Sequence, residues 1–531
     1  MRRLFLLLFW LWSAGTLQAV ITIDEIASKP SSRARDFLIW EFLRQKGVDE
    51  RSAKAAFALV KEKNNYKIKT AYAKIVDDDI RKEIECKKRK DLLAIKDQKC
   101  LQAAFSLSKT LSYSRFERDQ LQLLGLTSKQ KRLLKLQNEP YSFKRYLYYN
   151  PKTVIEYLNR IPIKTFETKL DKPLGAQSLK FLQSAPNFGS FVRLVATNYR
   201  LEALQRSLLR VEGDKLDERT NFFLALNALR HHDKKRAIAF LKLARKKAAY
   251  PIARDKADFW LYLVTKQRSY LETLLLSMSI NIYTLYAHEK MDVEVENYFT
   301  KLVTTKQKSK YNLQNPFDWL AILQEIHQTN RAKLFDLLKR YRNYDLLPVQ
   351  RFVLERAYDF KMHGYIMPYD KELKNIGIDD KSLLYALMRQ ESNYIPSGLS
   401  RSFALGLMQL MPFLVDHIAK KEHEKIVSYS EMFDPEKNLR YAWIHLRWLK
   451  RVLHDNPLFI AYAYNGGYGF FKRYKNSGRF GKGAYEPFLS MELMRNSETR
   501  EYGKRVLANF VMYKKIYREP FSLIGFFESL K

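Results

Sequence analysis

Glu391 is the residue whose surroundings best suit acid and base chemistry. It follows Leu384, Leu387 and Met388 at the spacing of one helical face, three, four and seven residues along from the first of them. A carboxyl group held against apolar side chains has its charged form disfavoured, so its pKa rises. The pattern predicts a carboxylic acid that donates a proton near neutral pH and then takes one back.

The alternative for Glu391 is a solvated helix end. Ser392 and Asn393 follow it, and a glutamate beside two polar residues can simply point to water. Segments further along the chain favour the chemical interpretation.

Three such segments follow Glu391 in order. Tyr394 and Pro396 lead to the stretch 406–412, which reads Gly-Leu-Met-Gln-Leu-Met-Pro. Residues 463–467 read Ala-Tyr-Asn-Gly-Gly, a helix stop at which backbone can approach a ligand. Residues 497–502 read Ser-Glu-Thr-Arg-Glu-Tyr.

Together with Glu391 and Ser392, these segments resemble the signature of soluble lytic transglycosylases, which are related in fold to goose-type lysozyme. The resemblance covers residues 381–513. It implies a lysozyme-like α domain that cleaves the MurNAc-GlcNAc bond of peptidoglycan, with Glu391 as acid and then base. It also implies a lyase step that leaves a 1,6-anhydro-muramyl end.

Three positions depart from the family pattern. Phe403 and Ala442 stand where the family usually has Gly, and Gly466 stands where it usually has Ala. We expect Phe403 to reshape the loop beside the site. Ala442 is small enough to preserve close helix packing.

The sequence supplies a set of candidate substrate-binding residues. Gln409 offers a donor and an acceptor for a sugar substituent, although a structural hydrogen bond is the alternative. The methionines could form apolar walls or ordinary core. The full set is Ser400, Met408, Gln409, Met411, Tyr464, Asn465 and Glu498. The resemblance gives Glu498 a supporting role, and a surface ion pair with Arg500 or Lys504 is its alternative.

Glycosidases normally use two carboxyl groups, and these motifs supply one. If the N-acetyl group of the substrate stabilises the cationic centre, Glu391 suffices. The first rival is a lysozyme-type hydrolase, which would need Asp416, Glu431 or Asp434 to activate water. The second is a helical scaffold that binds wall polymers without turnover.

Helices must position these residues. Asp379 can cap a helix that starts near Lys381, and Asp434 with Pro435 opens another. The latter carries an apolar stripe at Leu439, Ala442, Leu446, Leu449 and Leu453. A third helix is expected over 458–464.

The first two thirds of the chain read as all-α. Apolar residues recur at helical spacing, and segments 221–230 and 236–245 form a helical hairpin around a polar turn. A further helix is expected over 255–264. Without a strict internal period, an irregular superhelix is the better interpretation. We expect a signal peptide at 1–19, the superhelical and linker region at 20–365, and the catalytic domain at 366–531.

The N-terminus and composition indicate the compartment. Arg2 and Arg3 precede an apolar run that ends by residue 12, which is typical of a cleavable export signal and too short for a membrane anchor. Cleavage after Ala19 would release a periplasmic chain. No later segment reaches spanning length, so we expect the mature chain to have no transmembrane segment.

The net charge of +37 favours an acidic partner, namely peptidoglycan, with other wall-synthesis or secretion proteins as a second class. No nucleic-acid motif is present. A generally basic proteome would also explain the charge. No cofactor or metal is expected, and Cys86 and Cys100 could form a disulfide or remain free thiols.

Overall fold

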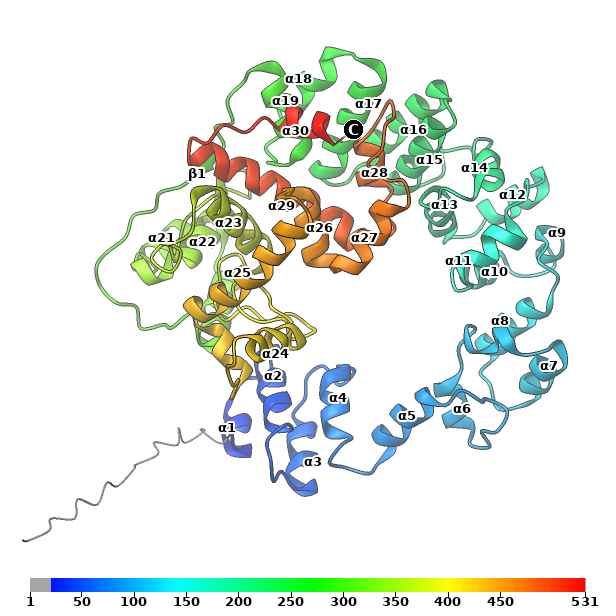
Figure 1. Cartoon of the computed structure of the whole chain (residues 1–531), viewed down its shortest axis with the longest axis horizontal. Helices are drawn as coiled ribbons and strands as arrows, with labels where there is room; N and C mark the ends of the chain where they lie inside the picture. The colour runs from blue at the N-terminus through cyan, green and yellow to red at the C-terminus, as the bar shows by residue number, and fades with distance from the viewer. Residues whose placement is uncertain (1–20, 531) are drawn as a thin grey trace, which may run out of the picture.

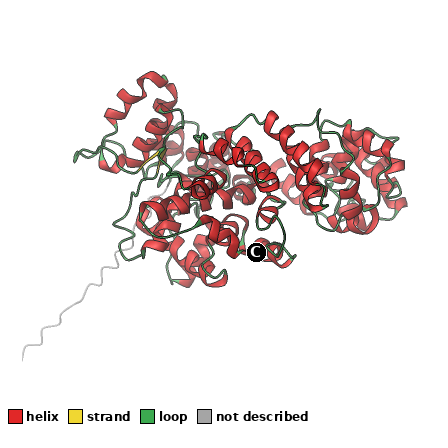
Figure 2. Ribbon diagram, turned by 90° about the horizontal axis from the view of Figure 1, so that it is seen from above, coloured by secondary structure: helices red, strands yellow, loops and turns green. Residues whose placement is uncertain are grey.

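The computed structural model describes residues 21–530 of this chain, so the predicted signal peptide lies outside the described residues. The described part is helical almost throughout (Figure 2), and the all-α prediction is confirmed. Its only strands are β1 (Tyr298–Phe299) and β2 (His363–Gly364), which pair in parallel.

Nineteen helices follow one another around an arc (Figure 1). They are α1 (Ile23–Ser28), α2 (Arg33–Phe42), α3 (Glu50–Ala58), α4 (Tyr66–Tyr72), α5 (Asp79–Lys88), α6 (Gln98–Ala104), α7 (Arg115–Leu123), α8 (Ser128–Asn138), α9 (Phe143–Tyr146), α10 (Pro151–Leu158), α11 (Ile163–Thr165), α12 (Ala176–Gln183), α13 (Phe188–Ala196), α14 (Glu202–Leu208), α15 (Glu218–Arg230), α16 (Lys234–Lys247), α17 (Pro251–Thr265), α18 (Arg268–Leu275) and α19 (Ile282–Met291).

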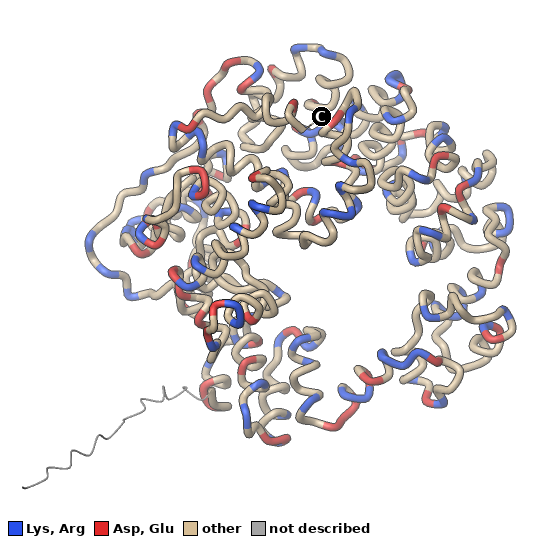
Figure 3. The backbone as a smooth tube through the Cα atoms, in the orientation of Figure 1, with Lys and Arg blue, Asp and Glu red and all other residues tan. Residues whose placement is uncertain are grey.

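Short antiparallel hairpins build this arc. Helices α15 and α16 form the hairpin expected from the sequence, and the Asp233 side chain caps α16 by accepting from the backbone N–H of Arg236 at 2.9 Å. Helix α17 packs next, with the rings of Phe222 and Trp260 6.2 Å apart. Basic and acidic residues are spread along the whole arc (Figure 3).

Two parts of the chain have small hydrophobic cores of their own. Cys86 and Cys100 form a disulfide between α5 and α6, beside a core that includes Leu101, Leu121 and Leu134. The second is an inserted module of α20 (Pro316–Gln328), α21 (Leu334–Arg340) and α22 (Leu347–Ala357). Because β1 precedes this module and β2 follows it, their pairing holds its two ends together.

The remaining helices form a compact C-terminal bundle. They are α23 (Ile378–Ser392), α24 (Pro412–Lys421), α25 (Pro435–Val452), α26 (Pro457–Gly466), α27 (Tyr468–Asn476), α28 (Phe488–Glu492), α29 (Ser497–Ile516) and α30 (Leu523–Ser529). Helix α29 packs against both α23 and α26. The contact with α26 needs Gly503, because a Cβ there would lie 2.2 Å from the Tyr462 ring.

Two helix starts test the sequence analysis. Asp434 caps α25 and Pro435 is its first residue, as predicted. The start of α23 was predicted wrongly: Gly377 occupies the N-cap position, and the helix begins at Ile378. Asp379 instead lies in the first turn and pairs with Lys514 of α29, so a tertiary contact takes the side chain expected to cap the helix.

The N-terminal helices close the arc into a ring by packing on the C-terminal bundle (Figure 1). The Trp40 ring of α2 stacks on Tyr429 at 5.3 Å, and Phe37 contacts Phe433 at 5.6 Å. Phe403, a departure from the family pattern, contacts Phe37 at 5.7 Å and Trp40 at 5.3 Å and is fully buried. Its side chain therefore forms part of the ring closure, although the sequence analysis expected it only to reshape a loop.

Polar groups surround this aromatic contact. The buried Glu41 carboxylate accepts hydrogen bonds from Ser428 Oγ at 2.5 Å and the Tyr429 backbone N–H at 3.0 Å. The Arg44 guanidinium lies 4.5 Å from the Tyr429 ring centroid. Burial raises the pKa of Glu41, and the bonds that it accepts offset part of this effect. The hydrogen bonds to the buried Glu41 carboxyl come from residues far along the chain. They therefore fix how α2 is aligned on the C-terminal bundle where the ring closes.

Replacing Trp40 by Ala should loosen the ring. Removing a buried aromatic side chain costs about 3 to 5 kcal/mol of folding free energy. Here the loss weakens the contact between α2 and the C-terminal bundle. We expect faster hydrogen–deuterium exchange of backbone amides in α2 and in segment 399–433, measured by mass spectrometry. Trp319→Ala, the same change in the separate core of the inserted module, is the control. Equal exchange of both segments in the Trp40 variant and the native chain would contradict this account.

Candidate active site

Glu391 lies in the last turn of α23. The residue that caps the end of this helix, Asn393, has a left-handed backbone conformation with φ 54°. Its carboxylate accepts a hydrogen bond of 2.6 Å from the Tyr502 hydroxyl of α29. Burial is the main reason that the pKa of Glu391 rises to about 7, and the negative charge of Glu498 adds to the rise. The bond from Tyr502 acts in the opposite direction. The carboxyl group can therefore exchange a proton near neutral pH.

Two tyrosines frame this carboxyl group. Tyr502 is buried, and its place on α29 depends on the close approach to α26 that the next residue, Gly503, allows. Tyr464, at the end of α26, donates from its hydroxyl to the Met408 carbonyl oxygen at 2.7 Å. Burial raises the pKa of both phenols further above their usual range, so both remain neutral donors.

The loop 398–411 runs beside the site, and hydrogen bonds within the loop fix its conformation. The Gln409 amide nitrogen donates to the carbonyl oxygens of Gly398 and Gly406, each at 2.9 Å. Gly406 has φ +75°, and a Cβ there would lie 2.2 Å from the Met432 carbonyl oxygen. Both donors of Gln409 are therefore used structurally, which leaves its amide oxygen as the group that could meet a ligand.

Three other candidates lie on the same loop. Ser400 is half-buried, and its hydroxyl accepts from the Ala404 backbone N–H at 2.8 Å. Met411 is half-buried at the start of α24. The Met408 side chain is fully buried and belongs to the core, so it cannot form the sugar-facing wall that the sequence analysis considered. Met408 contributes its carbonyl oxygen, which orients Tyr464.

The end of α26 is joined to the start of α29. Thr499 Oγ1 donates to the Asn465 amide oxygen at 2.8 Å. At Gly466 a Cβ would lie 2.8 Å from the same Thr499 oxygen and 2.9 Å from the Phe470 ring. This crowding gives a local reason for Gly at a position where Ala is usual in the family.

Glu498 is exposed in the first turn of α29. The ion pairs considered as its alternative do not form. Arg500 pairs with Glu501 at 3.0 Å, and Lys504 pairs with Glu492 at 2.9 Å. Glu498 instead acts on Glu391 through its charge alone.

Sequence reasoning missed Tyr502 as a site residue. Its position in the 497–502 segment was a signal, but no local pattern shows that its hydroxyl reaches a carboxylate 111 residues earlier in the chain.

The carboxylates that a water-activating hydrolase would need are engaged elsewhere. Asp416 accepts from the Tyr429 hydroxyl with both oxygens, at 2.9 and 2.7 Å. Glu431 accepts from the backbone N–H of Val427 at 2.7 Å and pairs with Lys437. Asp434 caps α25.

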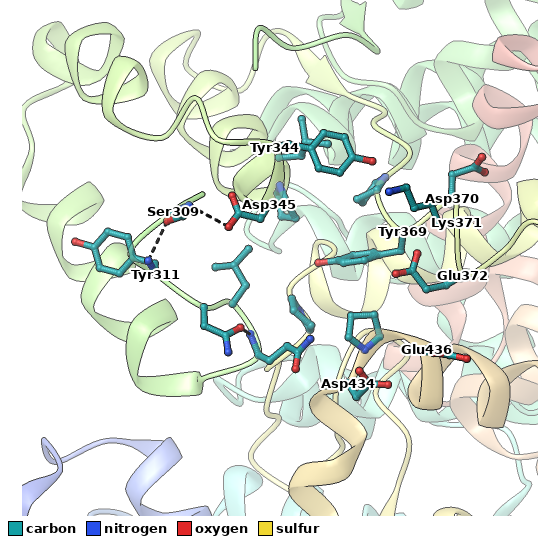
Figure 4. Close-up of a pocket in the computed structure, with 18 of the residues that line it drawn as sticks. Ser309, Tyr311, Tyr344, Asp345, Tyr369, Asp370, Lys371, Glu372, Asp434 and Glu436 are labelled. Atoms are coloured by element: carbon teal, nitrogen blue, oxygen red, sulfur yellow. Dashed lines mark hydrogen bonds between the residues drawn. The ribbon is translucent and has the colours of Figure 1, made fainter. Parts of the chain in front are cut away.

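Asp434 also lines a separate cavity of about 640 Å³ between the inserted module and the bundle (Figure 4). Asp345 and Tyr311 lie on one side of this cavity, and Tyr369 and Glu372 lie on the other (Figure 4). Glu391 is not among its lining residues.

Residues 21–530 contain neither a cluster of metal-ligating side chains nor a membrane-spanning helix. This part of the chain holds no group of three or more His, Cys, Asp or Glu side chains placed to bind a metal ion. None of its helices combines the length and apolar character needed to span a bilayer.

The sequence around this site matches a known family of domains. Residues 369–485, which include Glu391, Gln409 and Tyr464, match the family model "Transglycosylase SLT domain". This segment, which holds Glu391, is therefore a transglycosylase SLT domain. The arc and bundle also match the fold of solved soluble lytic transglycosylases. Lytic transglycosylase Slt from Pseudomonas aeruginosa aligns over 93% of this chain and 83% of its own, with a TM-score of 0.52 and 15% identity. The 70 kDa enzyme of Escherichia coli aligns over 94% and 85%, with a TM-score of 0.50 and 16% identity.

Relatives of the soluble lytic transglycosylase family are similar over shorter stretches. The soluble lytic murein transglycosylase of Escherichia coli K12 is 27% identical over 222 residues, which are 40% of this chain and 34% of that protein. The membrane-bound lytic murein transglycosylase C of Pectobacterium atrosepticum is 36% identical over 134 residues, which are 23% of this chain and 36% of that protein. The matched stretches thus span about a third of the length of these relatives.

Gly466→Ala should disturb the joint between α26 and α29. Overpacking of this kind costs about 1 to 3 kcal/mol, and we expect that loss in urea unfolding. Thr499→Ala removes two of the three crowding atoms and leaves the Phe470 ring, so the double variant should lose less than the sum of the two single variants. Gly469→Ala is the control, because its Cβ would meet only the Arg473 guanidinium at 3.5 Å. Additive losses at positions 466 and 499 would contradict the crowding.

Proposed function

We propose that this protein is a peptidoglycan lytic transglycosylase that cleaves the MurNAc-GlcNAc β-1,4 bond without water, with Glu391 as its acid and base. The observation that carries the proposal is the partly buried Glu391 carboxyl group, whose pKa is raised to about 7 and which accepts a hydrogen bond of 2.6 Å from the Tyr502 hydroxyl. The names of the similar proteins, which are lytic murein transglycosylases, support the same assignment.

The chemistry needs only groups that the chain and substrate supply. Protonated Glu391 gives its proton to the oxygen linking the two sugars, and the bond from that oxygen to muramyl C1 breaks with its electrons leaving on oxygen. The N-acetyl oxygen of the substrate then bonds to C1. In the second step the Glu391 carboxylate takes the proton of the C6 hydroxyl, whose oxygen attacks C1 and displaces the acetyl oxygen. The product is a 1,6-anhydro ring.

The positions of Asp416, Glu431 and Asp434 favour this route over hydrolysis. A hydrolase would need a second carboxylate free to activate water. Asp416, Glu431 and Asp434 are each committed to hydrogen bonds within the fold. A scaffold without turnover would have no need to keep one carboxyl group buried against Tyr502.

The same proposal covers the organisation and location of the chain. Residues 1–19 act as an export signal, 20–365 form the superhelical and linker region, and 366–531 form the catalytic domain. The mature chain works in the periplasm on peptidoglycan strands. Ser400, Gln409, Met411, Tyr464 and Asn465 line the substrate site, and Glu498 supports Glu391.

Glu391→Gln should abolish glycan cleavage while preserving the fold, because the amide cannot donate and accept the proton in turn. Purified sacculi are digested with the mature protein, and the released muropeptides are identified by mass spectrometry. The native chain should release anhydro-muramyl products, each one water lighter than the corresponding reducing-end product. Reducing-end products would instead support hydrolysis, and cleavage by the Gln variant would remove Glu391 from the mechanism. Glu431→Gln, which changes an acid outside the site, should still cleave.

The pH profile should respond in opposite directions to the two neighbours of Glu391. Tyr502→Phe removes a bond that lowers the Glu391 pKa, so the alkaline limb of kcat/KM should move to higher pH. Glu498→Gln removes a charge that raises the pKa, so that limb should move to lower pH. Shifts of the same sign, or none in either variant, would contradict Glu391 as the titrating acid.

A further inference from the structure

A second cavity lies where the superhelical arc meets the C-terminal bundle. It measures about 400 Å³ and is bounded by α15, α17 and α19 on one side and by α23 and α29 on the other. Phe222, Phe223, Ile252 and Ile282 give it an apolar wall. Gln390, the residue before Glu391, also lines it.

The floor of this cavity is a closed network of charges. Lys504 Nζ lies 2.9 Å from Glu492 and 3.0 Å from Glu501, and it donates to the Tyr283 hydroxyl at 3.1 Å. Arg500 completes the set through its pair with Glu501. Buried charges are stable only when paired in this way, so the floor groups satisfy one another.

The lining also carries cations outside this network. Arg219, Lys256 and Arg505 come from α15, α17 and α29, and within residues 21–530 none of their side chains donates a hydrogen bond or forms an ion pair. Lys256 Nζ lies 4.3 Å from the Phe222 ring centroid, and burial lowers its pKa. The charges of Glu492, Glu501 and Glu218 offset part of this effect without forming an ion pair with Lys256, so the ammonium group remains only partly compensated.

Nearby groups reinforce the positive field. The lining holds six cationic and three acidic side chains, and two of those acids, Glu492 and Glu501, belong to the floor network. Arg193 of α13 has its pKa lowered by burial and also by Arg219, Arg500 and Arg495. Such crowding of like charges from separate helices is relieved when an anion enters.

We propose that this cavity binds a small organic anion, with an acidic headgroup held by Lys256 and Arg505 and an apolar body on Phe222 and Ile282. Its volume falls within the range of small-molecule sites and suits a compact ligand or the last residues of a chain. A carboxylate or a phosphate group would satisfy the same cations. The site is separate from Glu391 and does not depend on glycan cleavage.

Isothermal titration calorimetry on the full mature chain tests the site. The probes are N-acetyl-alanyl-phenylalanine as the free acid, the same dipeptide as its amide, and inorganic phosphate. The free acid should bind at least about tenfold more tightly than the amide, because charge-assisted bonds to Lys and Arg are lost with the headgroup charge. It should also bind more tightly than phosphate, which lacks an apolar body.

Matched variants separate this site from the general basic charge. Lys256→Met and Arg505→Gln should each weaken binding of the free acid about tenfold or more. Arg254→Gln changes an exposed cation two residues away on α17 that does not line the cavity, so its affinity should match the native chain. Arg505 is exposed, so its variant should fold even if the Lys256 variant does not.

Several outcomes would overturn the proposal. These are no saturable binding of the free acid, equal affinity for acid and amide, affinity for phosphate at least equal to that for the acid, or an equal loss of affinity in the Arg254 variant. Because binding is measured without turnover, a failure here is distinguishable from a failure of glycan cleavage.

Discussion

The bond between the Tyr502 hydroxyl and the Glu391 carboxylate forms where three helices meet around a partly buried carboxyl group. A buried carboxyl group needs a hydrogen-bond partner, and α29 supplies it while α23 supplies the acid. Gly503 permits the close contact between α29 and α26, and α26 in turn carries Tyr464. The same contacts between helices therefore build the apolar packing of the bundle and set up the proton chemistry of the site.

The sequence predicted those features that local pattern determines. The apolar spacing before Glu391, the Asp434-Pro435 helix start and the hairpin at 221–245 all follow from neighbouring residues, and the helices that they predict are present. It could not predict features set by distant contacts. Lys514 pairs with Asp379, and the Tyr502 hydroxyl donates to the Glu391 carboxylate. No short pattern encodes a partner that lies a hundred residues away.

The departures from the family pattern acquire physical reasons in three dimensions. Phe403 has φ 54° and lies against Phe37 and Trp40, so a residue that looked like a change beside the site is also an anchor of the ring. Gly466 leaves room for Thr499, which holds Asn465. Both residues lie where an element of the bundle meets another part of the chain, and the contacts made there explain why each residue is suited to its position.

The closure of the ring also has a consequence for biogenesis. Phe37 and Trp40 pack against Phe403, Tyr429 and Phe433, which are synthesised more than 360 residues later. During synthesis the aromatic face of α2 therefore stays uncovered until most of the polypeptide has been made. Contacts of such long sequence separation form late, and exposed apolar surface invites aggregation meanwhile.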